Sequence, residues 1–381
     1  MASNAHPKKT LQNLFDDQAE ILRRSRKEVL ELRRIINKTS EDRLTAEKVR
    51  KEILGLAEYS PEPPKWLNHD PGKSTTGIPL IPLGDWHWGE TVDPDQVGGV
   101  NEFNRAEGRK RVHRLNDAVI DLCFHHMTNP SYPGAVICLL GDLITGNIHE
   151  DLSQTNDGPV MWSVNEVENQ IIGLLLSWKK KFKKLAIVCV PGNHGRNTPK
   201  PRINNRVYES YEWLIYCHIE QYFRDDPDVS VYVPNEVDAF FSIFGHKFML
   251  THGDLLGLKG GDGLIGALGP IARGTMKIGA QQRQIGRDFD TLVIGHYHFF
   301  LPRGDATPVL VNPALIGHNT YAHLQLRVRA NDPAQALTFV HPKWGFTAQW
   351  KMILDGRRKI IKPEPWFVWG GARTNRDLNL G

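Results

Sequence analysis

Five short stretches of the chain carry Asp, Asn or His side chains directly after apolar segments. They are Asp85-Trp-His87, Gly141-Asp142, Asn193-His194, Thr251-His252 and His296-Tyr-His298. Carboxylate, amide and imidazole groups together are typical ligands of hard-to-borderline divalent metal ions. Two such ions about 3.5–4 Å apart can activate water, neutralise phosphoryl oxygens and stabilise a leaving oxygen. The residue types therefore favour metal-dependent hydrolysis of a phosphoester, with the Asp142 carboxylate bridging the two ions.

The segment before each stretch is predicted to be a strand. Residues 136–140 are all apolar and run straight into Gly141-Asp142, which is typical of a strand buried on both faces. Ligands of open α/β sheets bind at the carboxyl ends of the strands, so the polar side chains are expected to meet at one rim. The strand at 78–83 is expected at a sheet edge, because Pro79 and Pro82 cannot donate hydrogen bonds to a ladder.

In order and type, these stretches resemble the motifs of the calcineurin-like metallophosphoesterases, which are D-x-H, G-D, G-N-H, a lone H and G-H-x-H. The resemblance covers about residues 78–314. It implies an α/β fold, a two-sheet β-sandwich flanked by helices in the family's four-layer arrangement, here with a small N-terminal helical segment. Within the family, a phage-type or DNA-repair-nuclease-like member is the expected type.

The resemblance also implies a role for each polar residue. The ligands that it implies for the first metal ion are Asp85, His87, Asp142 and His298, and those for the second are Asp142, Asn193, His252 and His296. The alternate spacing in Asp85-x-His87 and His296-x-His298 agrees, because alternate residues of an extended segment project to the same side. His194 is the expected catalytic residue, donating a hydrogen bond or proton near the leaving group. Two divalent ions are expected, Mn²⁺ first, with Fe or Zn²⁺ as alternatives.

Two positions depart from the better-known branches of the family. Protein-phosphatase relatives have D-R after G-D and Glu after G-N-H, whereas this chain has Leu143 and Gly195. Nuclease relatives usually have Asp after G-N-H, so Gly195 departs from that branch as well. The missing arginine argues against hydrolysis of phosphoprotein monoesters.

Two basic loops favour a polyanionic substrate. The candidate substrate-binding residues are Arg196, Lys200, Arg202 and Arg206, which follow His194, and Lys259 in a Gly-rich stretch. Cations at such places can contact flanking phosphates of a nucleic acid, although loop cations often only keep a surface soluble. The sequence thus predicts a phosphodiesterase, specifically a nuclease acting on DNA through a hydroxide that bridges the metals. A small-molecule phosphatase, a cyclic-nucleotide phosphodiesterase and a non-catalytic scaffold are the alternatives.

Four regions are predicted along the 381 residues. Residues 1–59 form a helical segment, 60–77 a linker, 78–320 the dinuclear metallophosphoesterase domain, and 321–381 C-terminal strands and a tail. The N-terminal helices could bind DNA, form a homo-oligomer or cover the catalytic domain, since their charges are nearly balanced. Later helices are expected at 104–127, 164–181 and 208–223, with antiparallel strands near 229–250.

Composition indicates a cytoplasmic location. The net charge is +4, and the four cysteines show no C-x-x-C spacing, which favours free thiols in a reducing compartment. The N-terminus has no signal-peptide core, and no apolar run approaches the roughly 20 residues that span a bilayer. No membrane partner is therefore expected.

Overall fold

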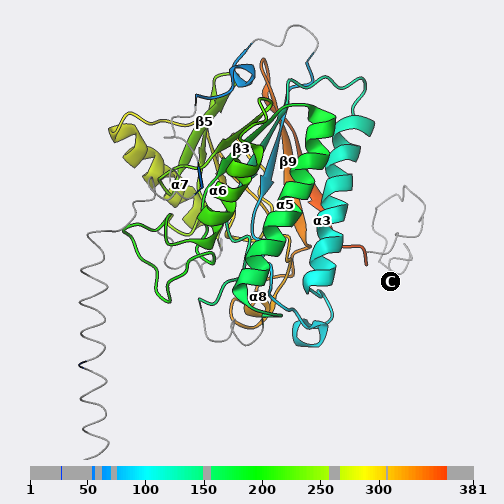
Figure 1. Cartoon of the computed structure of the whole chain (residues 1–381), viewed down its shortest axis with the longest axis vertical. Helices are drawn as coiled ribbons and strands as arrows, with labels where there is room; N and C mark the ends of the chain where they lie inside the picture. The colour runs from blue at the N-terminus through cyan, green and yellow to red at the C-terminus, as the bar shows by residue number, and fades with distance from the viewer. Residues whose placement is uncertain are drawn as a thin grey trace, which may run out of the picture. The chain divides into compact units, whose positions relative to one another are not determined.

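The computed structural model describes residues 27, 54–55, 62–69, 75–148, 156–256, 267–305 and 308–357 (Figure 1). The chain divides into two compact units, Met1–Ser60 and Pro61–Gly381. The predicted N-terminal helices, Lys259 and the C-terminal tail lie outside the described residues, apart from single N-terminal positions. The description below concerns the second unit.

The larger sheet has six strands in the order β10-β9-β1-β2-β3-β4. The four parallel strands are β1 (Ile78–Leu83), β2 (Ala135–Leu139), β3 (Leu185–Cys189) and β4 (Val229–Tyr232). The antiparallel strands β9 (Ala334–His341) and β10 (Gly345–Ile353) extend the sheet beyond β1. Every residue of β1, β2 and β3 is buried, as their continuous apolar sequence predicts.

The expectation that the proline-containing strand lies at an edge is wrong. β1 is central, between β2 and β9. Its pairing with β9 ends at Leu80, and its pairing with β2 begins at Leu80. Pro79 therefore precedes the ladder between β1 and β2, and Pro82 follows the ladder between β1 and β9. Each proline is thus paired with a strand on one side only, and a central position becomes tolerable.

The smaller sheet has the order β5-β6-β7-β8. β5 (Ala239–Ile243) and β6 (His246–Leu250) form the predicted antiparallel hairpin, while β7 (Thr291–Ile294) and β8 (Val309–Val311) continue in parallel. The predicted antiparallel strand near residue 229 is instead β4, which is parallel to β3 in the other sheet. Phe244-Gly245 forms a tight turn between β5 and β6, whereas the longer segment 233–238 separates β4 from β5.

α3 (Arg105–Ile120) and α6 (Tyr211–Phe223) begin at side-chain caps. α3 starts where the Asn104 side chain accepts a hydrogen bond from Glu107 N, and a short π-helical turn, η4 (Asp121–His125), continues it. The Ser210 side chain caps α6 in the same way. The remaining helical segments are α5 (Val160–Phe182), α7 (Leu268–Gln284), α8 (Thr320–Leu324) and the 3₁₀ turns η2 (Lys65–Leu67) and η3 (Pro94–Val97).

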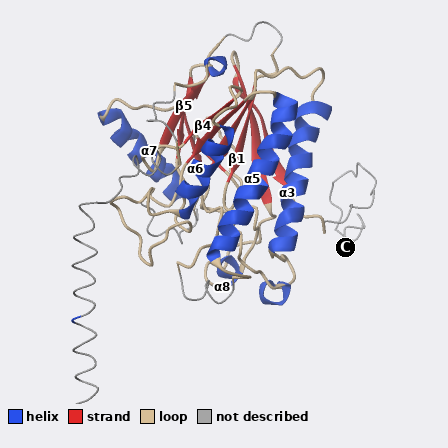
Figure 2. Cartoon of the chain, viewed as in Figure 1, coloured by secondary structure: helices blue, strands red, loops and turns tan. Residues whose placement is uncertain are grey.

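The two sheets share a hydrophobic core. One cluster joins Val136 and Val188 of the larger sheet to Phe248 and Val293 of the smaller sheet. A second cluster packs Ile271 of α7 against the smaller sheet. Figure 2 shows the strands between α7 on one side and α3 and α5 on the other. The predicted α/β class with two mixed sheets and flanking helices is confirmed. No helix among the described residues is long and apolar enough to cross a bilayer.

Candidate metal centre

Strand ends from both sheets bring the predicted ligands together. Asp85 and His87 follow β1, Asp142 follows β2, and Asn193 follows β3. From the smaller sheet, His252 follows β6, and His296 and His298 follow β7. All seven side chains come from the carboxyl ends of strands, where α/β sheets bind ligands.

The first cluster consists of Asp85, His87 and His298. His87 Nε2 lies 3.1 Å from His298 Nε2, and His298 Nε2 lies 3.4 Å from Asp85 Oδ1. Asp85 and His87 are buried, and His298 is half-buried. Three ligand atoms that face one another at this spacing could hold one divalent ion.

The second cluster consists of Asp142, His252 and His296. His252 Nε2 lies 3.0 Å from Asp142 Oδ2 and 3.2 Å from Asn193 Oδ1. The rings of His252 and His296 pack edge to face, with centroids 5.1 Å apart. Like the first cluster, this cluster combines carboxylate and imidazole ligands. The amide oxygen of Asn193 adds a fourth ligand atom.

Asp142 lies between the two clusters. It belongs to the second cluster and also forms a group with His87 and His194, whose rings are 4.6 Å apart. Its Oδ1 accepts a hydrogen bond from the backbone N of His194 at 2.7 Å, and its Oδ2 faces His252. This placement suits a carboxylate that bridges two ions, which remains a prediction.

Backbone carbonyl groups fix the orientation of two imidazoles. His252 Nδ1 donates to the Leu140 carbonyl oxygen at 2.8 Å, and His194 Nδ1 donates to the Thr145 carbonyl oxygen at 3.0 Å. In the neutral ring each Nε2 then keeps its lone pair. Such partners orient metal ligands in known sites. Asp254, two residues after His252, does not serve as this acceptor and pairs with Arg206 at 2.7 Å.

Left-handed backbone conformations concentrate at this site. Ten described residues other than glycine have positive φ, and five of them are Asp85, His87, Asp142, His296 and His298, with φ between 48° and 65°. Such conformations cost free energy for residues with a side chain, and they persist where the surrounding structure enforces them. The strain is therefore stored where the predicted ligands converge.

Burial keeps two of the four predicted imidazole ligands, His87 and His296, in the neutral form that binds a cation. Burial lowers the pKa of His296 to about 4, with a further contribution from His252. Burial together with His194 and His298 holds the pKa of His87 well below its usual range. Both rings are thus neutral near physiological pH, with lone pairs available. The residues present fit the predicted pair of divalent ions in ligand type, burial and placement.

The pKa values of His298 and His252 are raised instead, and the proton of His252 should be released on metal binding. Burial lowers its pKa, but the Asp142 carboxylate raises it more, to about 10. Without metal, His252 is therefore protonated at about pH 8, whereas a metal ligand must be neutral. We expect Mn²⁺ binding to release roughly one proton and to strengthen as the pH rises towards that pKa. Calorimetry in two buffers of different ionisation enthalpy measures this release, and a buffer-independent enthalpy would contradict it.

Comparisons with known proteins add little. No family model matches the sequence, and no curated protein matches it. Among solved structures, a candidate 5′-nucleotidase from Staphylococcus aureus matches with a TM-score of 0.33 and 12% identity, over 75% of this chain and 56% of that chain. The phosphopantetheinyl hydrolase from Mycobacterium tuberculosis matches with a TM-score of 0.28 and 11% identity, over 78% of this chain and 100% of that chain. The chain spans little more than half the length of the first protein, and likenesses this low carry no argument about function.

Gln335 holds the loop that carries the first two predicted ligands. Its Oε1 accepts from Gly84 N at 3.0 Å and from Trp86 Nε1 at 3.2 Å, and its Nε2 donates to the Gly84 carbonyl oxygen at 3.1 Å. Gln335 is fully buried on β9. The strand beside β1 thus holds the Gly84 backbone before Asp85 and the Trp86 side chain after it.

Two buried glutamates near the site were missed in the sequence. Glu90 Oε2 lies 3.8 Å from His87 Nδ1, Asn319 Nδ2 donates to Glu90 Oε1 at 2.9 Å, and burial raises the pKa of Glu90 to about 7. Glu212 accepts hydrogen bonds from the loops that carry Asp142 and Asn193, and burial raises its pKa to about 8. Glu90 could have been noticed as an acid within a tryptophan-rich stretch. Glu212 looks in sequence like an ordinary first-turn acid of a helix.

The candidate substrate-binding cations are mostly engaged with the protein. Arg196 donates to the carbonyl oxygens of Asn193 and Thr198. Arg202 pairs with Glu209 at 2.7 Å, and Arg206 pairs with Asp254. These three arginines line a small recess beside Asn193. Lys200 is exposed, and Lys259 lies outside the described residues.

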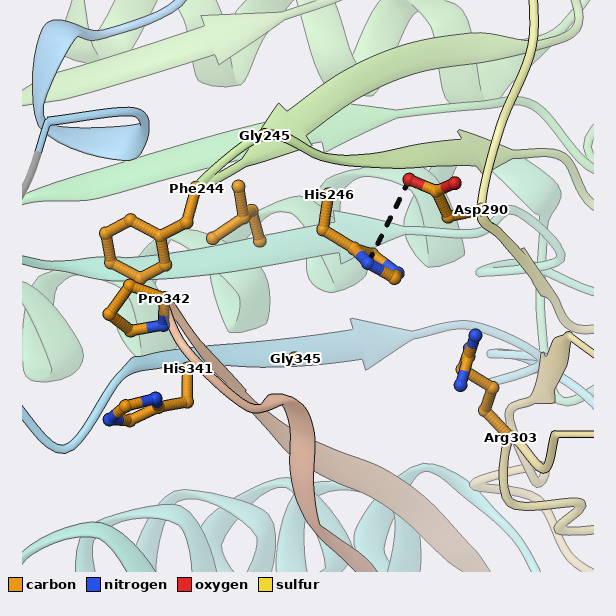
Figure 3. A pocket seen from close by; sticks show the side chains of 9 residues that line it. Phe244, Gly245, His246, Asp290, Arg303, His341, Pro342 and Gly345 are labelled. Carbon is orange, nitrogen blue, oxygen red and sulfur yellow. Dashed lines mark ion pairs between the residues drawn. The ribbon is translucent and has the colours of Figure 1, made fainter.

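A separate cavity of about 440 Å³ opens at the opposite ends of the strands (Figure 3). It is lined by His246, Asp290, Arg303 and His341 among others. Thr291 Oγ1 bonds both His246 Nε2 and Arg303 Nε, at 2.9 and 2.8 Å. These polar groups are tied to one another, and β6 separates them from His252 at its other end.

Proposed function

We propose that the chain is a phosphoester hydrolase that depends on two divalent metal ions. The observation that carries the proposal is the convergence of seven Asp, Asn and His side chains from five strand ends. The proposal includes membership of the calcineurin-like metallophosphoesterases and their four-layer arrangement. The packing of helices outside two sheets that share a core supports it.

The residues of the site suit phosphoester cleavage. Two bound ions would supply Lewis acidity and an activated water. Asp142 would hold both ions, and the other six side chains would complete their coordination. His194 has its Nδ1 engaged with the Thr145 carbonyl oxygen, so Nε2 is the atom that would give a proton to the leaving oxygen. Burial lowers the pKa of His194, so its protonated form would release that proton readily.

We propose DNA phosphodiesters as the substrate. The arginine-lined recess beside Asn193 and the exposed Lys200 support contacts to phosphates flanking the scissile bond. The ion pairs of Arg202 and Arg206 favour a second candidate, a small phosphoester, because paired cations are less available to a polyanion. Mn²⁺ is the proposed metal, with Fe or Zn²⁺ as alternatives.

A pair of loop substitutions separates these two substrates. We expect the double variant Lys200→Ala/Arg202→Ala to slow Mn²⁺-dependent cleavage of end-labelled DNA roughly 10-fold, because two phosphate contacts are lost. Turnover of a small chromogenic diester should change less than about twofold, since it has no flanking phosphates. Arg196 is left intact because it holds the Asn193 backbone.

Lys110→Ala serves as the control, because this exposed lysine lies on α3 and contacts Glu107 of the same helix. Equal loss on both substrates, or no loss on DNA, would contradict the DNA proposal. Absence of DNA cleavage together with Mn²⁺-dependent diester turnover would favour the small phosphoester. Absence of both activities would contradict the hydrolase itself.

A further inference from the structure

Glu212 links the two loops that carry Asp142 and Asn193. Its Oε1 accepts from Leu143 N at 2.7 Å, and its Oε2 accepts from Gly192 N at 2.6 Å. Leu143 directly follows Asp142, and Gly192 directly precedes Asn193. One carboxylate thus spans the loops after β2 and β3, although it belongs to the first turn of α6.

Glu212 is fully buried, and so are Leu143 and Gly192. A buried backbone N–H without an acceptor is destabilising, so removing the side chain of Glu212 would penalise both loops. A buried carboxylate is itself costly unless it is well bonded. Its two short hydrogen bonds are therefore the contacts that make this position tolerable.

The space that Glu212 fills is also the space into which residue 195 would project a side chain. A Cβ atom on Gly195 would lie 2.5 Å from Glu212 Cδ, 2.6 Å from Cγ and 2.7 Å from Oε2. At that distance the added Cβ atom and Glu212 Cδ would be as close as two carbon atoms of one side chain that are separated by two bonds. Gly195 has no positive φ, so its backbone would accept an ordinary residue. Residue 195 is thus a glycine because Glu212 occupies the space for a side chain, and not because the backbone requires glycine.

We infer that Glu212 is the positioning residue of the metal centre, and that its carboxyl group, supplied from α6, occupies the space beside the two loops that a side chain at residue 195 would otherwise fill. This inference rests on the proposed metal-dependent function. It explains why Gly195 departs from both family patterns: Glu212 already occupies the space for a side chain there. Tyr211 N donates to the Gly195 carbonyl oxygen at 2.8 Å, which keeps the start of α6 beside that loop.

A double-mutant cycle tests the inference. Glu212→Ala should weaken Mn²⁺ binding roughly 10- to 100-fold, the range for groups that orient metal ligands. Gly195→Glu alone should also weaken it, because two side chains compete for one space. The double variant Gly195→Glu/Glu212→Ala should recover to within about threefold of the wild type, because the carboxylate returns. Binding is measured by calorimetry, and thermal unfolding without metal is followed in parallel.

The control is Glu168→Ala, which removes a carboxylate of α5 that contacts His218 of α6 but neither loop. If Glu212→Ala fails to fold, Glu212→Gln replaces it in the cycle. Glutamine keeps the volume of the side chain but has only one acceptor oxygen. A single variant that binds Mn²⁺ like the wild type would overturn the inference, as would a double variant no better than the worse single one. Failure of the wild type to bind Mn²⁺ would overturn the proposed function as well, so the two failures are distinguishable.

Discussion

Replacing Asp142 by Asn is expected to abolish Mn²⁺-dependent phosphoester hydrolysis while the fold survives. Asparagine keeps the size of the side chain but removes its charge, and its NH₂ group cannot face a cation. Asp142 belongs to the second cluster and to the group with His87 and His194, so the proposed binding of both ions would be affected. We expect a loss of activity above about 100-fold, beyond the range for residues that only orient ligands.

The loss can be followed without relying on activity. Calorimetry with Mn²⁺ should show weakened binding and a smaller proton release, because Asp142 is what raises the pKa of His252. Asp288→Asn is the control, since this exposed carboxylate pairs with Lys247 at 2.8 Å. Retention of one-tenth of the activity in Asp142→Asn would contradict the bridging role.

The polar strand ends could be predicted because their signal is local. An apolar run such as 136–140 indicates a buried strand, and the residue at its end must lie at the sheet rim. Parallel pairing of β1, β2 and β3 then brings Asp85, Asp142 and Asn193 to the same edge. The hairpin of β5 and β6 was equally local, because Gly245 in its turn has positive φ.

The features that were missed depend on contacts between distant segments. The direction of β4 is set by pairing with β3, more than 40 residues earlier in the chain. The central place of β1 depends on where two separate ladders begin and end around Leu80. Glu212 is 70 residues from Asp142, and no periodicity of α6 distinguishes it from a capping acid. Such roles follow from tertiary packing, which a single sequence does not encode in its local pattern.

The loops after β2 and β3 approach each other closely at Gly192. The second large effect is therefore expected for the substitution Gly192→Ala. A Cβ atom at Gly192 would contact Asp142 N and Oδ1 far inside the 3.0 Å that real Cβ atoms keep, and would lie 2.8 Å from Asp142 Cγ. These neighbours cannot yield easily. Asp142 N is backbone, and the carboxylate is held by His194 N and His252.

We therefore expect Gly192→Ala to lower the free energy of unfolding by about 1–3 kcal/mol, as overpacking does in a dense interior. Mn²⁺ binding should weaken more than about 10-fold, because Asp142 must move to admit the methyl group. Urea unfolding without metal and calorimetry with Mn²⁺ measure the two effects separately.

Gly173→Ala is the matched comparison, because Gly173 lies within α5, is exposed and has no heavy atom within 4 Å of its added Cβ. There the same substitution should raise the free energy of unfolding by about 0.5–1 kcal/mol, through the helix preference of alanine over glycine, and leave metal binding unchanged. If the same substitution lowers the free energy of unfolding at Gly192 and raises it at Gly173, the penalty at Gly192 comes from its contact with Asp142. If both variants unfold alike and bind Mn²⁺ alike, the loops after β2 and β3 are not packed as tightly as this account of the metal centre requires.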